Sequence, residues 1–116
     1  MIVVIFEVEP KQGLTQSYLD HAAMLKPILD KMDGFISVER FESLAQPGKY
    51  LSLSFWRDEE AVKGWRNMAA HRKVQEDGRH KVFADYRLRV ASVIRDYGLK
   101  EREEAPKDSR SHHRPF

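Results

Sequence analysis

The chain has 116 residues, a formal net charge of +2 and a charged fraction of 33%, which suits one domain with a single core. It contains no cysteine, so disulfides, thiolate nucleophiles and cysteine-ligated metal sites are excluded. No apolar run approaches the roughly 20 residues that span a bilayer, and the apolar start lacks the flanking residues of a signal peptide. We therefore expect a cytoplasmic protein with no membrane partner.

The charges are interleaved rather than concentrated. Lys and Arg alternate with Asp and Glu along most of the chain, whereas nucleic-acid binding favours a basic stripe. Arg87, Arg89 and Arg95 fall close together, but on an alternating strand they are more simply its polar face. His112 and His113 are adjacent in a polar tail without a carboxylate or further ligand, which is a weak metal signal. We expect neither a nucleic-acid partner nor a metal site.

The first elements are a strand and a helix. Residues 2–8 alternate β-branched and aromatic side chains, which indicates a strand. Apolar residues then recur every three or four positions over 15–32, which is typical of an amphipathic helix. Pro27 lies inside this helix, so we expect a kink or break near residues 25 and 26.

Two strands follow, at residues 35–43 and 50–56. Pro47-Gly48 between them is a strong turn signal, so the strands should pair antiparallel. In the second strand two large aromatic residues and two serines face one side: Tyr50, Ser52, Ser54 and Trp56.

The last elements are helical and then extended. Asp58 is a good N-cap, and the two glutamates after it place negative charge in the first turn of a helix that runs to about Asn67. A second helical piece is expected at 68–76. Alternation then predicts a long final strand over 83–97.

This order of elements is that of the α+β ferredoxin-like βαββαβ fold, with a four-stranded antiparallel sheet and both helices on one face. The opposite face would expose a larger apolar patch than soluble monomers tolerate, so we expect a homodimer in which two sheets pack face to face. We assign the domain to residues 1–98. Residues 99–116 read as a polar C-terminal tail, disordered or laid over the surface.

Several short motifs occur in a characteristic order. They are Gly34-Phe35-Ile36-Ser37, Phe55-Trp56-Arg57-Asp58-Glu59-Glu60-Ala61, Trp65-Arg66, His71 and Tyr86-Arg87-Leu88-Arg89-Val90. In order and spacing they resemble the antibiotic biosynthesis monooxygenase (ABM) domain over about residues 1–98. The resemblance implies a dimeric α+β barrel, in agreement with the architecture indicated by the pattern of elements.

The resemblance implies more than one activity, because this family uses one fold for several reactions. Some members oxygenate aromatic polyketides or quinols with O2 and without metal or flavin, whereas others degrade heme. The heme branch uses an Asn in the first strand and a Trp and a ligand His on the second helix. Trp65 matches the tryptophan, but Phe6 stands near the Asn position and His71 follows Trp65 too closely. The favoured function is thus a cofactor-independent monooxygenase acting on a small phenolic or quinol-like molecule, with heme binding or degradation as the alternative.

Cofactor-free oxygenation requires a base, an anion stabiliser and a dry, aromatic-lined cavity. His71 is the candidate base because imidazole titrates near neutral pH, and Trp65 is a candidate cavity wall. Side chains that could orient a small aromatic substrate are Tyr18, His21, Asn67, Tyr86 and Arg89. Tyr86 and Arg89 are an odd number of positions apart and should not both point inward without a bulge.

Structural roles compete with these assignments. Trp65 on an amphipathic helix is first of all a core residue, and His71 is more often a hydrogen-bonded helix residue than a base. A third hypothesis is therefore a non-catalytic dimer that binds a small ligand.

Overall fold

The computed structural model describes residues 1–77 and 81–112. Its sheet has four antiparallel strands in the order β2-β3-β1-β4. The strands are β1 (Ile2–Pro10), β2 (Phe35–Glu42), β3 (Tyr50–Trp56) and β4 (Phe83–Ser92). The helices are α1 (Thr15–Leu29), α2 (Glu59–Arg66), α3 (Ala69–Asp77) and α4 (Lys107–His112). This is the predicted ferredoxin-like α+β fold, with the second helical region divided into α2 and α3.

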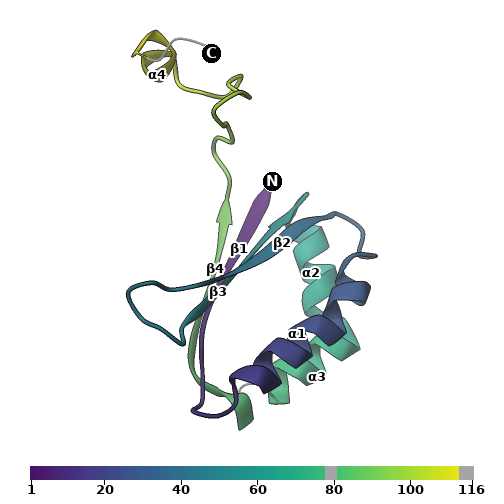
Figure 1. The fold of residues 1–116 in the computed structure, drawn as a ribbon. Coiled ribbons are helices and arrows are strands. Elements are labelled where there is room, and N and C mark those ends of the chain that lie inside the picture. The colour runs from purple at the N-terminus through teal and green to yellow at the C-terminus, as the bar shows by residue number, and fades with distance from the viewer. Residues whose placement is uncertain (78–80, 113–116) are drawn as a thin grey trace.

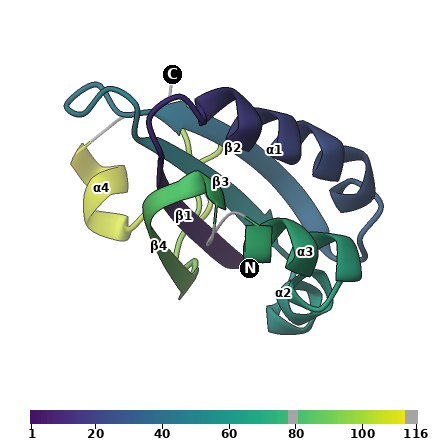
Figure 2. The ribbon, with the colours of Figure 1, turned by 90° about the horizontal axis from the view of Figure 1, so that it is seen from below.

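Helices α1, α2 and α3 all lie on one face of the sheet (Figure 1). Viewed from below, α1 lies beside the pair formed by α2 and α3 (Figure 2). Within the part of the chain that the structure describes, no helix combines the length and the apolar character needed to cross a membrane.

Helix α1 passes through Pro27 without interruption and ends at Leu29. The expected break near residues 25 and 26 is therefore wrong, whereas the expected kink stays a prediction. Pro27 cannot donate a hydrogen bond to the carbonyl of Ala23, but it lies in the last turn, so little of the helix depends on the lost bond. Single turns continue the chain to Met32, whose N–H donates to the carbonyl of Leu29 at 3.0 Å.

Helix α2 begins at the predicted cap. The Oδ1 atom of Asp58 accepts a hydrogen bond from the N–H of Ala61 at 2.9 Å, which satisfies one of the free amides of the first turn. Gly34 lies against this turn, because a Cβ atom placed on it would be 2.5 Å from the Cβ of Ala61. The φ of Gly34 is +81°, so both its backbone conformation and the close approach of α2 require glycine.

Strand β4 ends at Ser92, so the prediction of a strand through residue 97 was wrong for its last residues. The pairing with β1 ends at Ile2↔Ser92 because β1 begins there. One further hydrogen bond joins the N–H of Val93 to the carbonyl of Met1 at 3.0 Å. Among the described residues, no strand pairs with the chain beyond Val93.

The buried core is divided into two clusters. One joins β1 to α1 and contains Val8, Tyr18 and Val82. The other joins β3 to α1 and α2 and contains Leu29, Trp56 and Ala61. Tyr18, Leu29 and Trp56 also line a single cavity, which therefore lies between the two halves of the core.

The outer face of the sheet carries none of the helices α1 to α3 (Figure 1). The register pairs Val3 with Phe55 and Ile5 with Leu53, and alternation places these four apolar side chains on that outer face. The homodimer that the sequence predicted stays a prediction.

Beyond Ser92 the chain leaves the sheet and projects away from the domain toward α4 (Figure 1). The Cα radius of gyration is 16.8 Å, against roughly 13 Å for a compact chain of this length. Hydrogen bonds link this segment to itself: the N–H of Gly98 donates to the carbonyl of Glu101 at 2.7 Å, and the N–H of Asp96 donates to the carboxylate of Glu104 at 3.1 Å. The boundary near Gly98 also stays a prediction.

Candidate functional site

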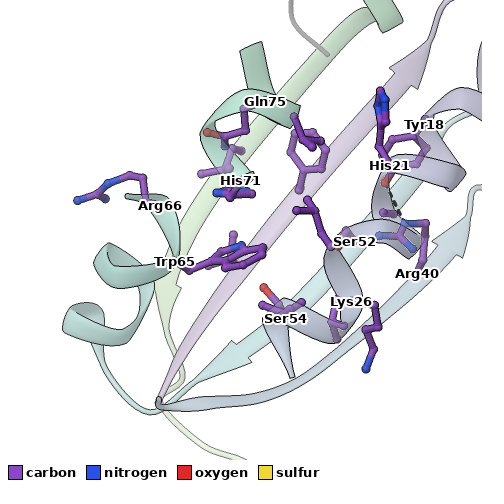
Figure 3. Close-up of a pocket in the computed structure, with 18 of the residues that line it drawn as sticks. Tyr18, His21, Lys26, Arg40, Ser52, Ser54, Trp65, Arg66, His71 and Gln75 are labelled. Carbon is purple, nitrogen blue, oxygen red and sulfur yellow. Dashed lines mark hydrogen bonds between the residues drawn. The ribbon is translucent and has the colours of Figure 1, made fainter. Parts of the chain in front are cut away.

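A cavity of about 440 Å³ lies between the inner face of the sheet and helices α1, α2 and α3. Its volume is in the range of small-molecule sites. Even-numbered positions of the strands form its floor, as alternation requires: Val4, Phe6, Val38, Arg40, Ser52, Ser54, Trp56, Leu88 and Val90. Apolar side chains dominate the lining, with a few polar groups at two ends (Figure 3).

The first polar end is formed by Trp65 of α2 and His71 of α3, which both line the cavity. Their ring centroids are 4.5 Å apart with an interplanar angle of 25°, so the rings are stacked (Figure 3). In one continuous helix, residues six positions apart would differ by roughly 120° around the axis and could not stack. Here α2 ends at Arg66 and α3 begins at Ala69, and the turn between them brings the imidazole over the indole.

His71 is a buried base with a spare nitrogen. Its Nδ1 atom is buried and has no hydrogen-bond partner among the described residues. Burial is the main cause that lowers the pKa of His71 below its ordinary value; a hydrogen bond with the backbone of Trp65 raises it, and the charge of Arg72 lowers it further. The imidazole is therefore neutral at pH 7 and can accept a proton.

The second polar end is formed by Tyr18 of α1 and Arg40 of β2. The Nε atom of Arg40 donates a hydrogen bond to the Oη of Tyr18 at 2.9 Å, and the guanidinium carbon lies 5.3 Å from the centre of the tyrosine ring (Figure 3). Tyr18 is 6% exposed and packs against the rings of Tyr50 and Phe83. Burial raises the pKa of Tyr18, and Arg40 opposes this shift, so the phenol stays protonated at neutral pH.

Four side chains singled out from the sequence line the cavity: Tyr18, His21, Trp65 and His71. Tyr86 is on the inner face of β4, where its ring contacts Phe6 and Phe83, but it is not part of the lining.

Asn67 and Arg89 lie elsewhere. Asn67 is the exposed C-cap of α2, and its Oδ1 accepts a hydrogen bond from Arg72. Arg89 is on the outer face of the sheet, where its Nη1 lies 2.7 Å from the Oε2 of Glu7. Tyr86 and Arg89 thus face opposite sides of β4.

Sequence reasoning missed seven polar residues of the lining: Lys26, Glu39, Arg40, Ser52, Ser54, Arg66 and Gln75. The two serines could have been found, because they alternate with Tyr50 and Trp56 on one face of the strand. Arg40 shares its strand face with Val38 and could have been found in the same way, but its hydrogen bond to Tyr18, which is 22 residues away in the sequence, could not.

No group of three or more His, Asp or Glu side chains among the described residues could hold a metal ion. His113 lies outside the described residues. The cavity offers two histidines, His21 and His71, and of these the Nδ1 of His71 is a buried nitrogen without a partner.

Comparison with known proteins connects these features to one family. The profile described as antibiotic biosynthesis monooxygenase matches residues 1–77. The Pyricularia oryzae protein named jasmonate monooxygenase ABM is 48% identical over 93 residues, which cover 80% of this chain and 43% of that protein. The Bacillus subtilis protein YqjZ is 28% identical over 84 residues, which cover 72% of each chain. A solved structure from Deinococcus radiodurans, described as a candidate antibiotic biosynthesis monooxygenase, has a TM-score of 0.75 at 14% identity, covering 84% of this chain and 97% of that one.

The fold and the cavity define a ferredoxin-like domain with a pocket of small-molecule size between its sheet and its helices. The chain belongs to the antibiotic biosynthesis monooxygenase family. It spans less than half the length of the Pyricularia oryzae relative.

Proposed function

We propose that the chain is a monooxygenase that oxidises a small phenolic or quinol-like molecule with O2, without a metal or flavin. The observation that carries the proposal is the neutral imidazole of His71, which stacks on Trp65 in the wall of an apolar cavity. Family membership supports the reaction class, as does the name of the Pyricularia oryzae relative.

The reaction begins with a proton transfer. The imidazole of His71 accepts the phenolic proton, and the apolar lining leaves the resulting anion poorly solvated and electron-rich. The anion passes one electron to O2, and the two radicals combine to form a C–O bond. The O–O bond then breaks, so that a substrate CH2 becomes C=O and the second oxygen leaves as water with the two hydrogens. All four electrons come from the substrate, so no further reductant is needed.

The other cavity residues position the substrate. Trp65 provides a flat wall against which an aromatic ring can stack, and Tyr18 and His21 present polar groups from α1. Ser52 and Ser54 offer hydroxyl groups from the floor, although the Oγ of Ser54 already accepts a hydrogen bond from the indole N–H of Trp56 at 3.0 Å.

The test is O2 consumption by metal-free protein with a panel of anthrones and hydroquinones. We expect at least one substrate to give protein-dependent uptake, and His71→Gln to reduce its rate about a hundredfold or more. Lys73→Gln, at an exposed position of the same helix, is the matched control and should not change the rate. Uptake that is unaffected by His71→Gln would show that His71 is not the base.

Two alternative functions predict different results, one in a hemin titration and the other in the O2 assay. A heme protein is favoured by the unpartnered nitrogen of His71, and it predicts a Soret shift on hemin titration that His71→Gln abolishes. A non-catalytic binding dimer predicts ligand binding without O2 uptake for the whole panel.

We also propose that the chain forms a homodimer through the outer face of its sheet. The apolar pairs Val3 with Phe55 and Ile5 with Leu53 support this proposal, because they lie on the face without helices. Light scattering at micromolar concentration should give about twice the 13.6 kDa mass of one chain, and a single-chain mass would contradict the dimer.

A further inference from the structure

The end of the cavity away from Trp65 and His71 presents a positioned guanidinium (Figure 3). Arg40 is on the inner face of β2, and its Nε donates a hydrogen bond to the Oη of Tyr18. Because Tyr18 is 6% exposed and packed between other rings, it is a rigid support for this hydrogen bond. The two Nη groups of Arg40 remain available for a ligand, since Arg40 makes no ion pair among the described residues.

The charges around the cavity are unbalanced. Its lining contains three cationic side chains, Lys26, Arg40 and Arg66, and a single carboxylate, Glu39. Lys26 is neutralised locally by Asp30, 2.5 Å away. Glu39 belongs to the opposite face of β2 by alternation, because it pairs with Leu53, and it does not compensate Arg40.

Ser52 completes a polar corner. It is the Cα partner of Arg40 across β2 and β3, and both side chains line the cavity. A planar carboxylate can accept two parallel N–H bonds from a guanidinium and a third hydrogen bond from a nearby hydroxyl. Apolar side chains make up most of the remaining wall, with Phe6, Val38 and Leu25 among them.

From this arrangement we propose that Arg40, supported by Tyr18 and assisted by Ser52, binds the carboxylate of an amphipathic monoanion whose apolar body extends toward Trp65. A neutral ligand of the same shape would cover Arg40 without pairing with it, which costs binding free energy. The site therefore selects carboxylates over their esters. The proposal names a substrate class for the cavity and so rests on the proposed function for turnover, but binding can be tested without turnover.

The experiment measures binding by displacement of the neutral fluorescent probe N-phenyl-1-naphthylamine from the intact chain. The competitors are jasmonate and its methyl ester, together with 1-naphthylacetate and its methyl ester. We expect each acid to bind about tenfold more tightly than its ester, a modest factor because Arg40 is solvent-accessible at the cavity mouth. Rising salt concentration should weaken the acids and leave the esters unchanged.

Variants identify the residue responsible. Arg40→Met should abolish the preference for acids and leave the affinity of the esters within about twofold, whereas Arg40→Lys should retain part of the preference. Tyr18→Phe should reduce the preference by releasing the Nε of Arg40. Arg72→Met, at an exposed position outside the lining, is the control and should retain the full preference.

Three results would overturn the proposal: equal affinity for acids and esters, no binding of either at millimolar concentration, or a preference that survives Arg40→Met. The outcome is separate from the O2 assay. If acids are preferred through Arg40 but no O2 is consumed, the oxygenase is contradicted and the carboxylate site stands. If O2 is consumed but acids are not preferred, the carboxylate site is contradicted and the oxygenase stands.

Discussion

The imidazole of His71 stacks on the indole of Trp65 with 4.5 Å between ring centroids, although the two residues are only six positions apart. The contact exists because α2 and α3 are separate helices. It places the imidazole and the indole in the same part of the cavity lining. A proton acceptor and a surface for an aromatic ring are thus provided by one short segment of the chain.

The lowered pKa of His71 predicts how stability depends on pH. Between the folded pKa and the ordinary value of about 6.5, the unfolded chain binds more protons than the folded chain, so the free energy of unfolding rises with pH. This contribution is fully present above about pH 6.5 and is lost as the pH falls toward the folded pKa. Urea denaturation between about pH 5 and pH 8 measures the free energy of unfolding at each pH. This free energy should rise with pH in the wild type and rise less steeply in His71→Gln. Identical slopes would contradict a depressed pKa.

The pH dependence of turnover follows from the same group. If His71 acts as the base, kcat/KM should rise with pH through its folded pKa and level off above it, because only the neutral imidazole accepts the proton. A profile that rises only above pH 8 would point to a different base.

The two tryptophans should differ in what their loss affects. Trp56 is 1% exposed and belongs to the core, so Trp56→Ala should cost roughly 3 to 5 kcal/mol of unfolding free energy. Trp65 is only partly buried, so Trp65→Ala should cost about half as much or less while weakening binding of N-phenyl-1-naphthylamine. Chemical denaturation and probe titration of both variants measure the two effects. Equal destabilisation would assign Trp65 to the core alone.

The sequence was sufficient to predict the elements that depend on neighbouring residues in the chain. The alternation of residues 50–56, the Pro47-Gly48 turn and the cap at Asp58 each predicted what the structure shows. The strand faces followed as well, since the serines and Trp56 lie on the cavity side. These features depend on neighbours a few positions away, which the sequence displays directly.

Features set by distant partners could not be predicted. The end of β4 is fixed by where β1 begins, at Ile2, and not by the alternation that continues past Ser92. Alternation along β2 places Arg40 on the cavity side, but its hydrogen bond to Tyr18 joins residues 22 positions apart and is not visible in the sequence. The division into two helical pieces was predicted, but the stack of His71 on Trp65 depends on how the turn between α2 and α3 orients them, which the sequence does not show.

Gly34 and Gly48 offer a matched pair of substitutions. Both have positive φ, of +81° and +89°, but a Cβ atom on Gly34 would lie 2.5 Å from the Cβ of Ala61, whereas one on Gly48 meets nothing within 4 Å. Gly48→Ala should therefore lower the free energy of unfolding by about 1 kcal/mol, the cost of a positive φ for alanine. Gly34→Ala should lower it by about 3 kcal/mol or more, because the steric overlap adds to that cost. Denaturation curves of the two variants give the comparison.

A double variant isolates the steric part of this effect. Adding Ala61→Gly to Gly34→Ala removes the Cβ–Cβ overlap, so part of the lost stability should return despite the cost of glycine in a helix, about 1 kcal/mol. If the double variant is less stable than Gly34→Ala by that full cost, the contact with α2 is not what constrains Gly34.

Removal of residues 99–116 should leave the domain folded. Residues 99–112 hydrogen-bond to the adjacent residues 96–98, as in the bond from the N–H of Gly98 to the carbonyl of Glu101, and they project from the sheet instead of covering the cavity (Figure 1). We expect the 1–98 chain to lose less than about 1 kcal/mol of unfolding free energy and to bind N-phenyl-1-naphthylamine with unchanged affinity. Circular dichroism during urea denaturation and probe titration measure both. A loss of more than about 2 kcal/mol, or of cooperative unfolding, would show that the domain extends into the tail.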